Sequence, residues 1–334
     1  MVKTWEAQKI DIDEARLHLT VKEVLQDALG RSVVVSSMNH EPSSFATLSP
    51  ANILHIGLQS GEKISLFLKH IGSEESEHPD KKGIDREIRI YDELIRDDCL
   101  PVAKYYGSKW NDKTKRRELF LEYIDDWNLQ YHDLEHWFTA ARRLAHFHMF
   151  FANQAKKLLN CEYLLRFDDV YLCEWAGMAL SAVADQSGEL AKKLEYVVSN
   201  YDLIAEVLTH QPWTLVHNDL SPKNVIADRR SRPARICFID WEMAGVGCGL
   251  MDLVHLKYGL DPKNDRIMFE AYCAELTGTD LLPSNQQDSS NLLAACELHK
   301  TIYRLAHSKI WDLSIETVAQ WVIEAEQFLS RVRE

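Results

Sequence analysis

The chain has 334 residues, 46% hydrophobic and 27% charged, and is long enough to bury a large core in two domains or in one two-lobed unit. Its 38 Lys and Arg against 51 Asp and Glu give a net charge of −13. This argues against sequence-independent nucleic-acid binding, which requires a basic surface. No apolar run reaches the roughly 18 residues of a membrane span, and the charged start does not resemble a signal peptide. We expect a cytoplasmic protein with no nucleic-acid and no membrane partner.

The seven cysteines are scattered along the chain and form no Cys-x-x-Cys pair. An odd number without regular spacing indicates reduced thiols. Neither a disulfide framework nor a zinc site is expected.

The first third of the chain has the pattern of a small sheet with two helices. Helical spacing of apolar residues predicts helices at 13–29 and 84–97, the first stopping at Gly30. The polar run 72–83 predicts a surface loop. Runs rich in β-branched and aliphatic residues predict strands at 33–38, 51–58, 62–71, 102–110 and 117–124.

The remainder is mostly helical in pattern. Helices are expected at 134–159, 170–184, 189–209, 266–277, 291–310 and 315–333. Two strands, at 214–219 and 235–240, are the exception. We therefore expect an α+β chain, with a strand-rich part at 1–124 and a helical remainder at 125–334.

The segment HNDLSPKN, residues 217–224, ends the first of these two strands. The pattern His-x-Asp-x-x-x-x-Asn has a known role in the mechanism of phosphoryl transfer, where the Asp accepts a hydroxyl proton and the Asn binds magnesium. Taken alone, an Asx-rich loop with a proline is also ordinary turn chemistry. The functional interpretation needs support from elsewhere in the chain.

Three further residues give that support. Asp240 ends the strand 235–240 and is an oxygen ligand suited to magnesium. Lys69 lies at the end of an apolar strand, where a lone cation is costly to bury unless an acid pairs with it. Glu87, on the following helix, is the available partner. A strand lysine paired with a helix glutamate is part of the kinase mechanism.

Along the chain, Lys69 and Glu87 are followed by LFLEYIDD (119–126), HNDLSPKN (217–224) and FIDWEMAGVGCGLMDL (238–253). In the order of these motifs the chain resembles the aminoglycoside phosphotransferase and choline kinase-like family. The resemblance implies a bilobal protein kinase-like fold. Its N-lobe, residues 1–124, has a small antiparallel sheet and a helix and binds the nucleotide, and its larger helical C-lobe, residues 125–334, carries catalysis and acceptor binding. ATP and Mg²⁺ are the implied cofactors. Asp-Trp-Glu at 240–242, and the lack of an Ala-Pro-Glu segment after it, distinguish the chain from protein kinases.

The resemblance also implies roles for individual residues. Asp219 matches the catalytic base. Lys69 matches the lysine that binds the α- and β-phosphates, oriented by Glu87, and Asn224 and Asp240 match the magnesium ligands.

The same resemblance implies roles for two further parts of the chain. Backbone groups of Glu122, Tyr123 and Ile124 match the adenine-binding connector. Asp252 matches an aspartate that we expect to support the catalytic loop. The phosphate-covering segment departs from the family, because residues 39–51 contain no glycine; Ser43, Ser44 and Phe45 are its candidates for phosphate contact.

The acceptor is less defined by the sequence. The implied reaction transfers the γ-phosphate of ATP to a hydroxyl of an amine-bearing small molecule, aminoglycoside-like or choline/ethanolamine-like. Asp125, Asp126, Asp133 and Glu135 would suit an amine, but a solvated acidic stretch explains them equally well. A non-catalytic kinase-fold binding protein is the alternative function.

The glycines of GVGCG, residues 245–249, imitate a dinucleotide-binding fingerprint. That fingerprint should follow the first strand of a βαβ unit and open a helix directly, whereas these glycines follow Asp-Trp-Glu. We therefore expect a flexible loop there.

Overall fold

A computed structural model describes residues 12–43, 49–72, 78–81, 83, 85–283 and 285–333. The chain forms two compact units, which are described separately. The first comprises Met1–Trp127 and Asp228–Glu242, and the second comprises Asn128–Ala227 and Met243–Glu334. Residues 228–242 thus return to the first unit after the chain has entered the second. The lobe limits 1–124 and 125–334 stay a prediction.

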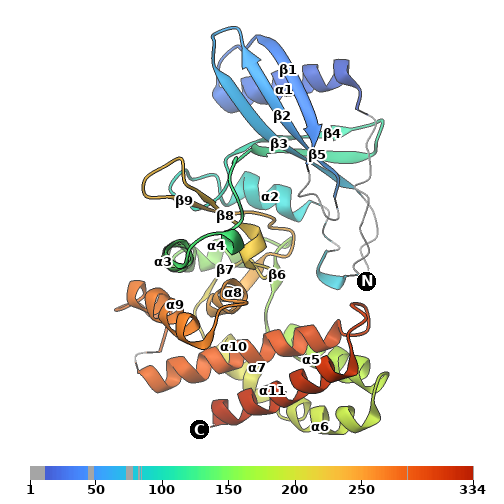
Figure 1. Ribbon diagram of the computed structural model, residues 1–334, viewed down its shortest axis with the longest axis vertical. Coiled ribbons are helices and arrows are strands. Elements are labelled where there is room, and N and C mark those ends of the chain that lie inside the picture. The colour runs from blue at the N-terminus through green and yellow to red at the C-terminus, as the bar shows by residue number, and fades with distance from the viewer. Residues whose placement is uncertain are drawn as a thin grey trace. The chain divides into compact units, whose positions relative to one another are not determined.

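The first unit is built on a five-stranded antiparallel sheet in the order β1-β2-β3-β5-β4 (Figure 1). The strands are β1 (Val35–Pro42), β2 (Ala51–Leu58), β3 (Lys63–Gly72), β4 (Tyr105–Asn111) and β5 (Arg116–Glu122). The unit also contains helices α1 (Glu14–Leu29) and α2 (Arg86–Glu93), a 3₁₀ turn at Pro79–Lys81, and strand β9 (Arg235–Phe238). All five strands expected in this part of the chain are present.

Helix α1 covers one face of this sheet. It begins at Asp13, whose side chain accepts a hydrogen bond from the backbone N–H of Arg16, and ends at Gly30, which has a φ of 61°. Its buried face packs against apolar side chains of β2, β3 and β5 in one core cluster. Arg16 is bound to the buried carboxylate of Glu118 on β5 at 2.8 and 3.0 Å, which fixes the helix on the sheet.

The second unit is mainly helical and its helices pack against one another, with α10 in contact with α5, α8 and α11 (Figure 1). The helices are α3 (Leu134–Ala152), α4 (Ala155–Leu159), α5 (Asp169–Ala184), α6 (Gly188–Val198), α7 (Tyr201–Thr209), α8 (Leu250–Leu256), α9 (Pro262–Glu275), α10 (Gln286–Ala306) and α11 (Ile315–Arg333). The short strands are β6 (Leu165–Arg166), β7 (Trp213–Val216), β8 (Val225–Asp228) and β10 (Gly245–Cys248), and 3₁₀ turns lie at Leu129–Tyr131 and Pro222–Asn224.

Two helices expected as continuous are each divided in two. The segment 134–159 breaks at Asn153, whose side chain donates to the carbonyl of Met149 at 3.0 Å. The segment 189–209 breaks at Asn200, whose side chain donates to the carbonyl of Tyr196 at 2.7 Å. An Asn side chain that binds the carbonyl four residues back competes with the helical backbone, and this ends the helix.

The expectation of a flexible loop at residues 245–249 is wrong. Gly245–Cys248 is strand β10, fully buried, antiparallel to β7 and parallel to β6. The glycines are there because neighbouring chain is close: a Cβ at Gly245 would lie 2.6 Å from the carbonyl oxygen of Leu165, and one at Gly247 would lie 2.9 Å from Cβ of Phe167.

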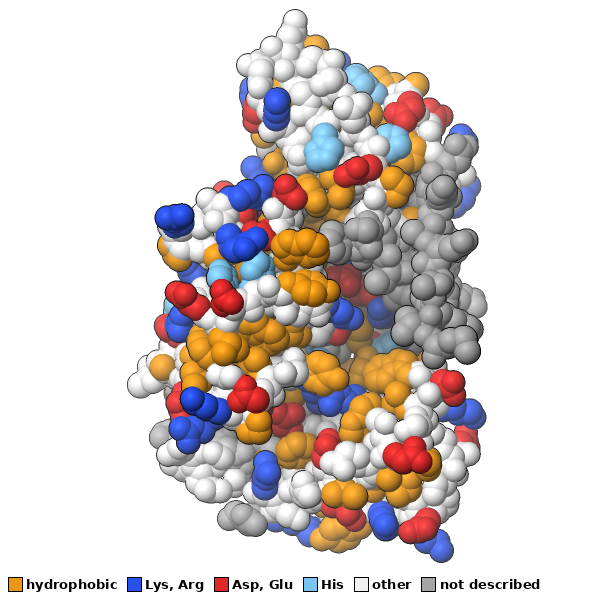
Figure 2. All heavy atoms as spheres, viewed as in Figure 1, with side chains coloured by type: hydrophobic (Ala, Val, Ile, Leu, Met, Phe, Trp, Pro, Cys, Tyr) orange, Lys and Arg blue, Asp and Glu red, His pale blue; other side chains and the backbone are white. Residues whose placement is uncertain are grey.

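The remaining expectations concern charge, thiols and membranes. Acidic and basic side chains are interspersed on the face drawn in Figure 2. All seven cysteines are free thiols, in agreement with the sequence. None of the helices in the described ranges combines the length and the apolar character needed to cross a bilayer.

Candidate active site

Lys69 lies at the centre of a charged cluster in the first unit. Its Nζ donates to Oε2 of Glu87 at 2.7 Å and to Oδ1 of Asp240 at 2.6 Å. The side chain of Glu87 is 3% exposed and that of Asp240 is 32% exposed. Two carboxylates from distant parts of the sequence therefore converge on one lysine, as predicted for the first pair.

Three different elements position these side chains. Lys69 is on β3, paired with Ala51 of β2 and Leu119 of β5. Because side chains alternate along a strand, it points away from the face on which Leu66 and Leu68 pack against α1. Glu87 lies in the first turn of α2.

Asp240 follows β9 and has a φ of 70°. A positive φ is uncommon outside glycine, with Asp among the residues that tolerate it, and it turns the backbone sharply at the strand end. The strand itself is fixed where Phe238 forms a bridge to Val102 and its N–H donates to the carbonyl of Pro101 at 2.7 Å.

Burial and charge act against each other in this cluster. Burial works to lower the pKa of Lys69, but Asp240 and then Glu87 outweigh it, so the pKa lies well above its ordinary value. For Glu87 burial is the larger effect and raises its pKa to about 7, against the opposing attraction of Lys69. Lys69 is therefore a permanently charged group in a buried setting.

Glu242 extends the cluster in a way that the sequence did not indicate. It forms an ion pair with Lys81, and its carbonyl accepts a hydrogen bond from Arg86 at 2.7 Å. Arg86 also binds the carbonyl of Asp80. Lys81 belongs to the polar run expected to be a surface loop, and a pair of residues 161 positions apart in the chain leaves no local signal. These contacts fix the segment after Asp240 within the first unit.

The predicted adenine-binding connector follows β5. The N–H of Glu122 donates to the carbonyl of Lys104 at 2.8 Å, and that of Tyr123 donates to the carbonyl of Ser65 at 3.0 Å. The Glu122 carboxylate is held by Arg235 at 2.7 and 2.9 Å. Within the described ranges, the N–H of Ile124 makes no such bond. Among the three connector residues, the N–H of Ile124 is thus the backbone donor that can still take a hydrogen-bond partner.

The glycine-free segment 39–51 is only partly described. Ser43 is buried, and its N–H donates to the carbonyl of Ala51 at 2.8 Å. Ser44 and Phe45, the other two candidates for phosphate contact, lie outside the described residues.

Asp219 and Asn224 lie together in the second unit. Asn224 donates from Nδ2 to the Asp219 carbonyl at 2.7 Å and to the Asp219 carboxylate at 3.1 Å. Lys223 lies 3.4 Å from the same carboxylate. Because the amide nitrogen of Asn224 is directed at Asp219, its Oδ1 is the atom available to a cation. The predicted base and one predicted metal ligand are therefore neighbours.

Asp252 supports the backbone immediately before Asp219. This fully buried carboxylate accepts from the N–H of His217 at 2.7 Å and from that of Asn218 at 2.8 Å. His148, buried between Asp252 and the hydroxyl of Tyr272, contacts the same carboxylate at 3.3 Å. Asn218 has a φ of 65°, and its side-chain amide nitrogen is buried without a hydrogen-bond partner in the described part of the chain. These contacts fit the supporting role expected for Asp252.

The acidic stretch formed by Asp125, Asp126, Asp133 and Glu135 is not a uniformly negative surface. Asp126 is held by the guanidinium of Arg229 at 3.1 Å and by its N–H at 2.9 Å. Burial would raise the pKa of Asp126, but these hydrogen bonds reverse the effect and lower it to about 2. Asp125, Asp133 and Glu135 are exposed. A hollow of about 470 Å³ lies beside Asp125 and Asp126, bordered also by Trp127 and Arg230.

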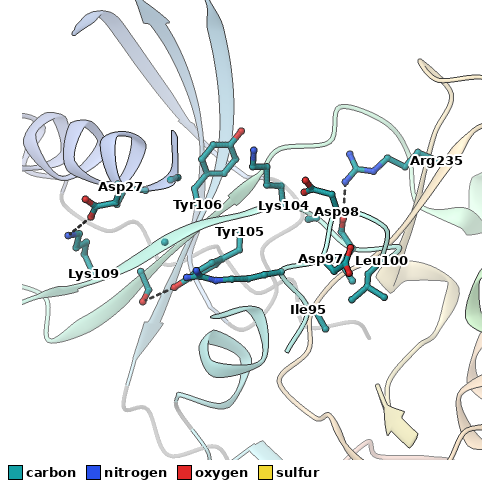
Figure 3. A pocket seen from close by; sticks show the side chains of 17 residues that line it. Asp27, Ile95, Asp97, Asp98, Leu100, Lys104, Tyr105, Tyr106, Lys109 and Arg235 are labelled. Atoms are coloured by element: carbon teal, nitrogen blue, oxygen red, sulfur yellow. Dashed lines mark hydrogen bonds and ion pairs between the residues drawn. The ribbon is translucent and has the colours of Figure 1, made fainter. Parts of the chain in front are cut away.

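A second cavity in the first unit lies apart from the Lys69 cluster. It encloses about 440 Å³ between α1, residues 95–100 and β4 (Figure 3). Two of its cations are already engaged, since Arg235 is bound to Glu122 and Lys109 lies 3.6 Å from Asp27. We assign it no role in the candidate site.

Comparison with solved structures places the fold in a known class. The chain is similar to an ethanolamine kinase from Plasmodium vivax, with 14% identity and a TM-score of 0.62 over 98% of this chain and 93% of that one. It is similar to a choline kinase from Cryptosporidium parvum, with 12% identity and a TM-score of 0.57 over 96% of each chain. A GDP complex of an aminoglycoside 2'-phosphotransferase matches with 14% identity and a TM-score of 0.54 over 94% and 98%. The expected α+β, protein kinase-like fold is confirmed.

The amino-acid sequence was also compared with curated proteins and with the profiles of protein families. No curated protein sequence matches the chain significantly. The profile of the phosphotransferase enzyme family matches residues 59–282, which is about two thirds of the chain and includes Lys69, Glu87, Asp219 and Asp240. The chain therefore belongs to the phosphotransferase enzyme family.

Proposed function

We propose that the protein is an ATP- and Mg²⁺-dependent kinase that transfers the γ-phosphate of ATP to a hydroxyl group of a small molecule. The observation that carries this proposal is the convergence of Glu87 and Asp240 on Lys69. Stability of the fold does not by itself explain a buried cation held by two acids, because apolar residues that replace a buried ion pair often give an equally stable protein. It has a clear use in binding nucleotide phosphates.

In this proposal Lys69 binds the α- and β-phosphates and Glu87 fixes its position. The adenine binds along Glu122, Tyr123 and Ile124, and the unused backbone N–H of Ile124 supports that assignment. The carboxylate of Glu122 takes no part, because Arg235 holds it.

Asp219 is the proposed catalytic base, which accepts the proton of the acceptor hydroxyl as the oxygen attacks the γ-phosphorus. Its orientation is supported by the Asn224 side chain and by the backbone contacts of Asp252. A base positioned in this way contributes typically 10²- to 10⁴-fold to the rate.

Asn224 and Asp240 are the proposed magnesium ligands. Both offer the hard oxygen atoms that magnesium prefers, and magnesium usually binds one or two carboxylates together with phosphate oxygens. In the described ranges no three His, Cys, Asp or Glu side chains gather to form a complete metal site, which fits an ion bound jointly with a nucleotide. Magnesium, when bound, would neutralise negative charge on the phosphates.

For the class of acceptor we propose a small molecule that bears an amine. The names of the similar structures, ethanolamine kinase, choline kinase and aminoglycoside phosphotransferase, favour an amine-bearing acceptor. The acidic stretch adds little, because Asp126 is neutralised by Arg229. The free thiols support a reducing compartment such as the cytoplasm.

The test is an ADP-release assay with ATP, Mg²⁺ and a panel of hydroxylated amines, amino sugars and hydroxy acids. We expect acceptor-dependent turnover that falls at least 100-fold in Asp219→Asn and in Asp240→Asn. Asp27→Asn, the same change at an exposed site on α1, is the matched control. Near-full turnover in both site variants would contradict the proposal. ATP binding without turnover for any acceptor would favour the alternative, a non-catalytic kinase-fold binding protein.

A further inference from the structure

Two basic side chains lie close together in the second unit, on helix α10. Lys300 and Arg304 are one turn apart and so project from the same face of the helix. Both lie over the ring of Tyr258, with Nζ of Lys300 5.1 Å and Cζ of Arg304 4.6 Å from its centroid. Arg304 also lies 5.6 Å from the ring centroid of Trp321 on α11. Two like charges thus share one aromatic ring.

Neither cation has an acidic partner among the residues that the structure describes. Lys300 is 8% exposed, and its Nζ donates to the backbone carbonyl of Val254 at 2.5 Å. Arg304 is partly buried and makes no ion pair in the described ranges. Glu297, the acid one turn before, is bound to Lys257 at 2.5 Å. Buried like charges without a counter-ion are costly, so the arrangement needs a reason.

The pKa of Lys300 reflects this setting. Burial, followed by repulsion from Arg304, lowers it to about 7. The pKa of His255 is lowered well below its ordinary value by burial and then by Lys300 and Arg304. An anion bound beside these groups would reverse the effect, because it favours the charged form of Lys300.

The position of the pair connects it with the predicted catalytic loop. Val254, which binds Lys300, lies on α8 two residues after Asp252. Asp252 holds the backbone of His217 and Asn218, directly before Asp219. The negative charge of Asp219 acts on Lys300 as well. The two cations therefore belong to the neighbourhood of the proposed base within the same unit.

We propose that Lys300 and Arg304 bind an anionic group of the acceptor, so that the hydroxylated substrate carries a carboxylate or a phosphate. This inference rests on the proposed function and specifies its substrate class. The guanidinium of Arg304 can bind an oxyanion through two parallel hydrogen bonds, and the rings of Tyr258 and Trp321 hold its plane in place. Lys300 supplies the second charge.

The same pair disfavours an acceptor that is only a cation. A quaternary or primary amine beside two cations that form no ion pair in the described ranges is repelled, and repulsion of this kind is a common means of excluding competing ligands. Amine-bearing acceptors remain compatible with the site when they also carry an anionic group, as a hydroxylated amino acid does.

The first experiment compares acceptors that differ only in the anionic group. Glycerol, glycerate and glycerol 3-phosphate form one series, and ethanolamine and serine form another, all tested for ADP release with ATP and Mg²⁺. We expect kcat/KM to be at least tenfold higher for an anionic member than for its neutral or cationic counterpart. A preference for glycerate or for glycerol 3-phosphate distinguishes a carboxylate from a phosphate. A preference for ethanolamine over serine, or for glycerol over both of its anionic counterparts, would overturn the inference and leave the kinase proposal intact.

Variants test whether the two cations cause this preference. In Arg304→Gln and Lys300→Met the KM for the preferred anionic acceptor should rise at least tenfold, while the KM for ATP stays within twofold of the original. Arg304→Lys keeps the charge but not the paired hydrogen bonds and should recover part of the loss. Lys309→Met, which removes an exposed cation shortly after α10, is the matched control and should change neither KM. An unchanged acceptor KM in folded Arg304→Gln would overturn the inference.

Direct binding separates a failure of the inference from a failure of the proposed function. If no acceptor is turned over, and Asp219→Asn is indistinguishable from the original protein, the kinase proposal fails. Calorimetric titration with inorganic phosphate and with glycerate then decides on the anion site. Binding that is lost in Arg304→Gln and kept in Lys309→Met supports it, and absence of binding overturns it. Circular dichroism and urea unfolding of each variant show that it is folded.

Discussion

The ammonium of Lys69 lies 2.7 Å from the carboxylate of Glu87 and 2.6 Å from that of Asp240, a residue 171 positions further along the chain. The pairing makes the first compact unit depend on a residue that the chain reaches only after it has passed through about half of the second. It also makes the stability of this unit and its proposed affinity for nucleotide depend on the same three side chains.

Lys69→Met should destabilise the protein by about 3 kcal/mol, because it leaves the buried carboxylate of Glu87 without a counter-ion. Glu87→Gln should cost less, since Lys69 keeps Asp240. Urea unfolding measures both changes. Lys109→Met is the control, because Lys109 makes longer contacts, of 3.5 and 3.6 Å, with exposed acids and should contribute about 0–1 kcal/mol. In ATP titrations, Glu87→Gln should bind at least tenfold more weakly, and unchanged ATP affinity would mean that the cluster is only structural.

Asp252→Asn should destabilise the protein by about 2 kcal/mol, because one carboxylate oxygen that accepts a backbone N–H is replaced by a donor. We expect kcat to fall 10- to 100-fold with little change in the KM for ATP, since Asp252 acts through the backbone beside Asp219. Steady-state kinetics and thermal unfolding measure the two effects. Asp185→Asn, at an exposed site bound to Lys309, should change neither. A fall in stability without any fall in kcat would exclude the positioning role.

Gly245→Ala should destabilise the protein by at least 2 kcal/mol, because the new Cβ would lie 2.6 Å from a backbone oxygen and 2.8 Å from the Phe167 ring. Gly177→Ala in α5 is the matched control, since nothing lies within 4 Å of its added Cβ. Alanine is the better helix former, so this variant should gain about 0.5–1 kcal/mol. Thermal unfolding of the two proteins measures changes of opposite sign, and equal changes would contradict the close packing of β10.

The buried Lys300 should make stability depend on pH. Its pKa in the folded protein is about 7, below the ordinary value of 10.5 that applies in the unfolded chain. Between these two values the unfolded state holds a proton that the folded state lacks, so the free energy of unfolding rises with pH. One group contributes at most about 1.4 kcal/mol per pH unit.

Urea unfolding of the original protein and of Lys300→Met at pH 6.5 and pH 9 isolates this contribution. Arg304, Lys257, Glu297 and Asp219 also act on Lys300, and all of them remain in the variant. We expect the original protein to gain stability relative to Lys300→Met as the pH rises. A difference between the two proteins that does not change with pH would contradict the lowered pKa.

Much of the first unit follows from local sequence pattern. Runs rich in β-branched and aliphatic residues predict the strands of the sheet, and the stop at Gly30 predicts the end of α1. The Lys69–Glu87 pair is predictable because a cation at the end of an apolar strand needs an acid, and Glu87 is on the next helix.

Other parts could not be predicted from pattern alone. The breaks at Asn153 and Asn200 depend on side-chain bonds to the helix backbone, which compete with a strong helical periodicity. Strand β10 consists half of glycine and has no strand-like composition; its conformation comes from the neighbouring β6 and β7. The ion pair of Lys81 with Glu242 and the stacking of Lys300 and Arg304 on Tyr258 arise only from tertiary packing.

The return of residues 228–242 to the first unit has a consequence for biosynthesis. A ribosome that has completed residue 127 has synthesised the whole five-stranded sheet, yet β9, Asp240 and Glu242 are still about a hundred codons away. Until they emerge, Lys69 has Glu87 but not Asp240, and Glu122 lacks Arg235. A nascent N-terminal fragment is therefore an incomplete unit, and the first unit is complete only when residues 228–242 have been added. A protein truncated after residue 127 should for the same reason be far more sensitive to proteolysis than the full chain.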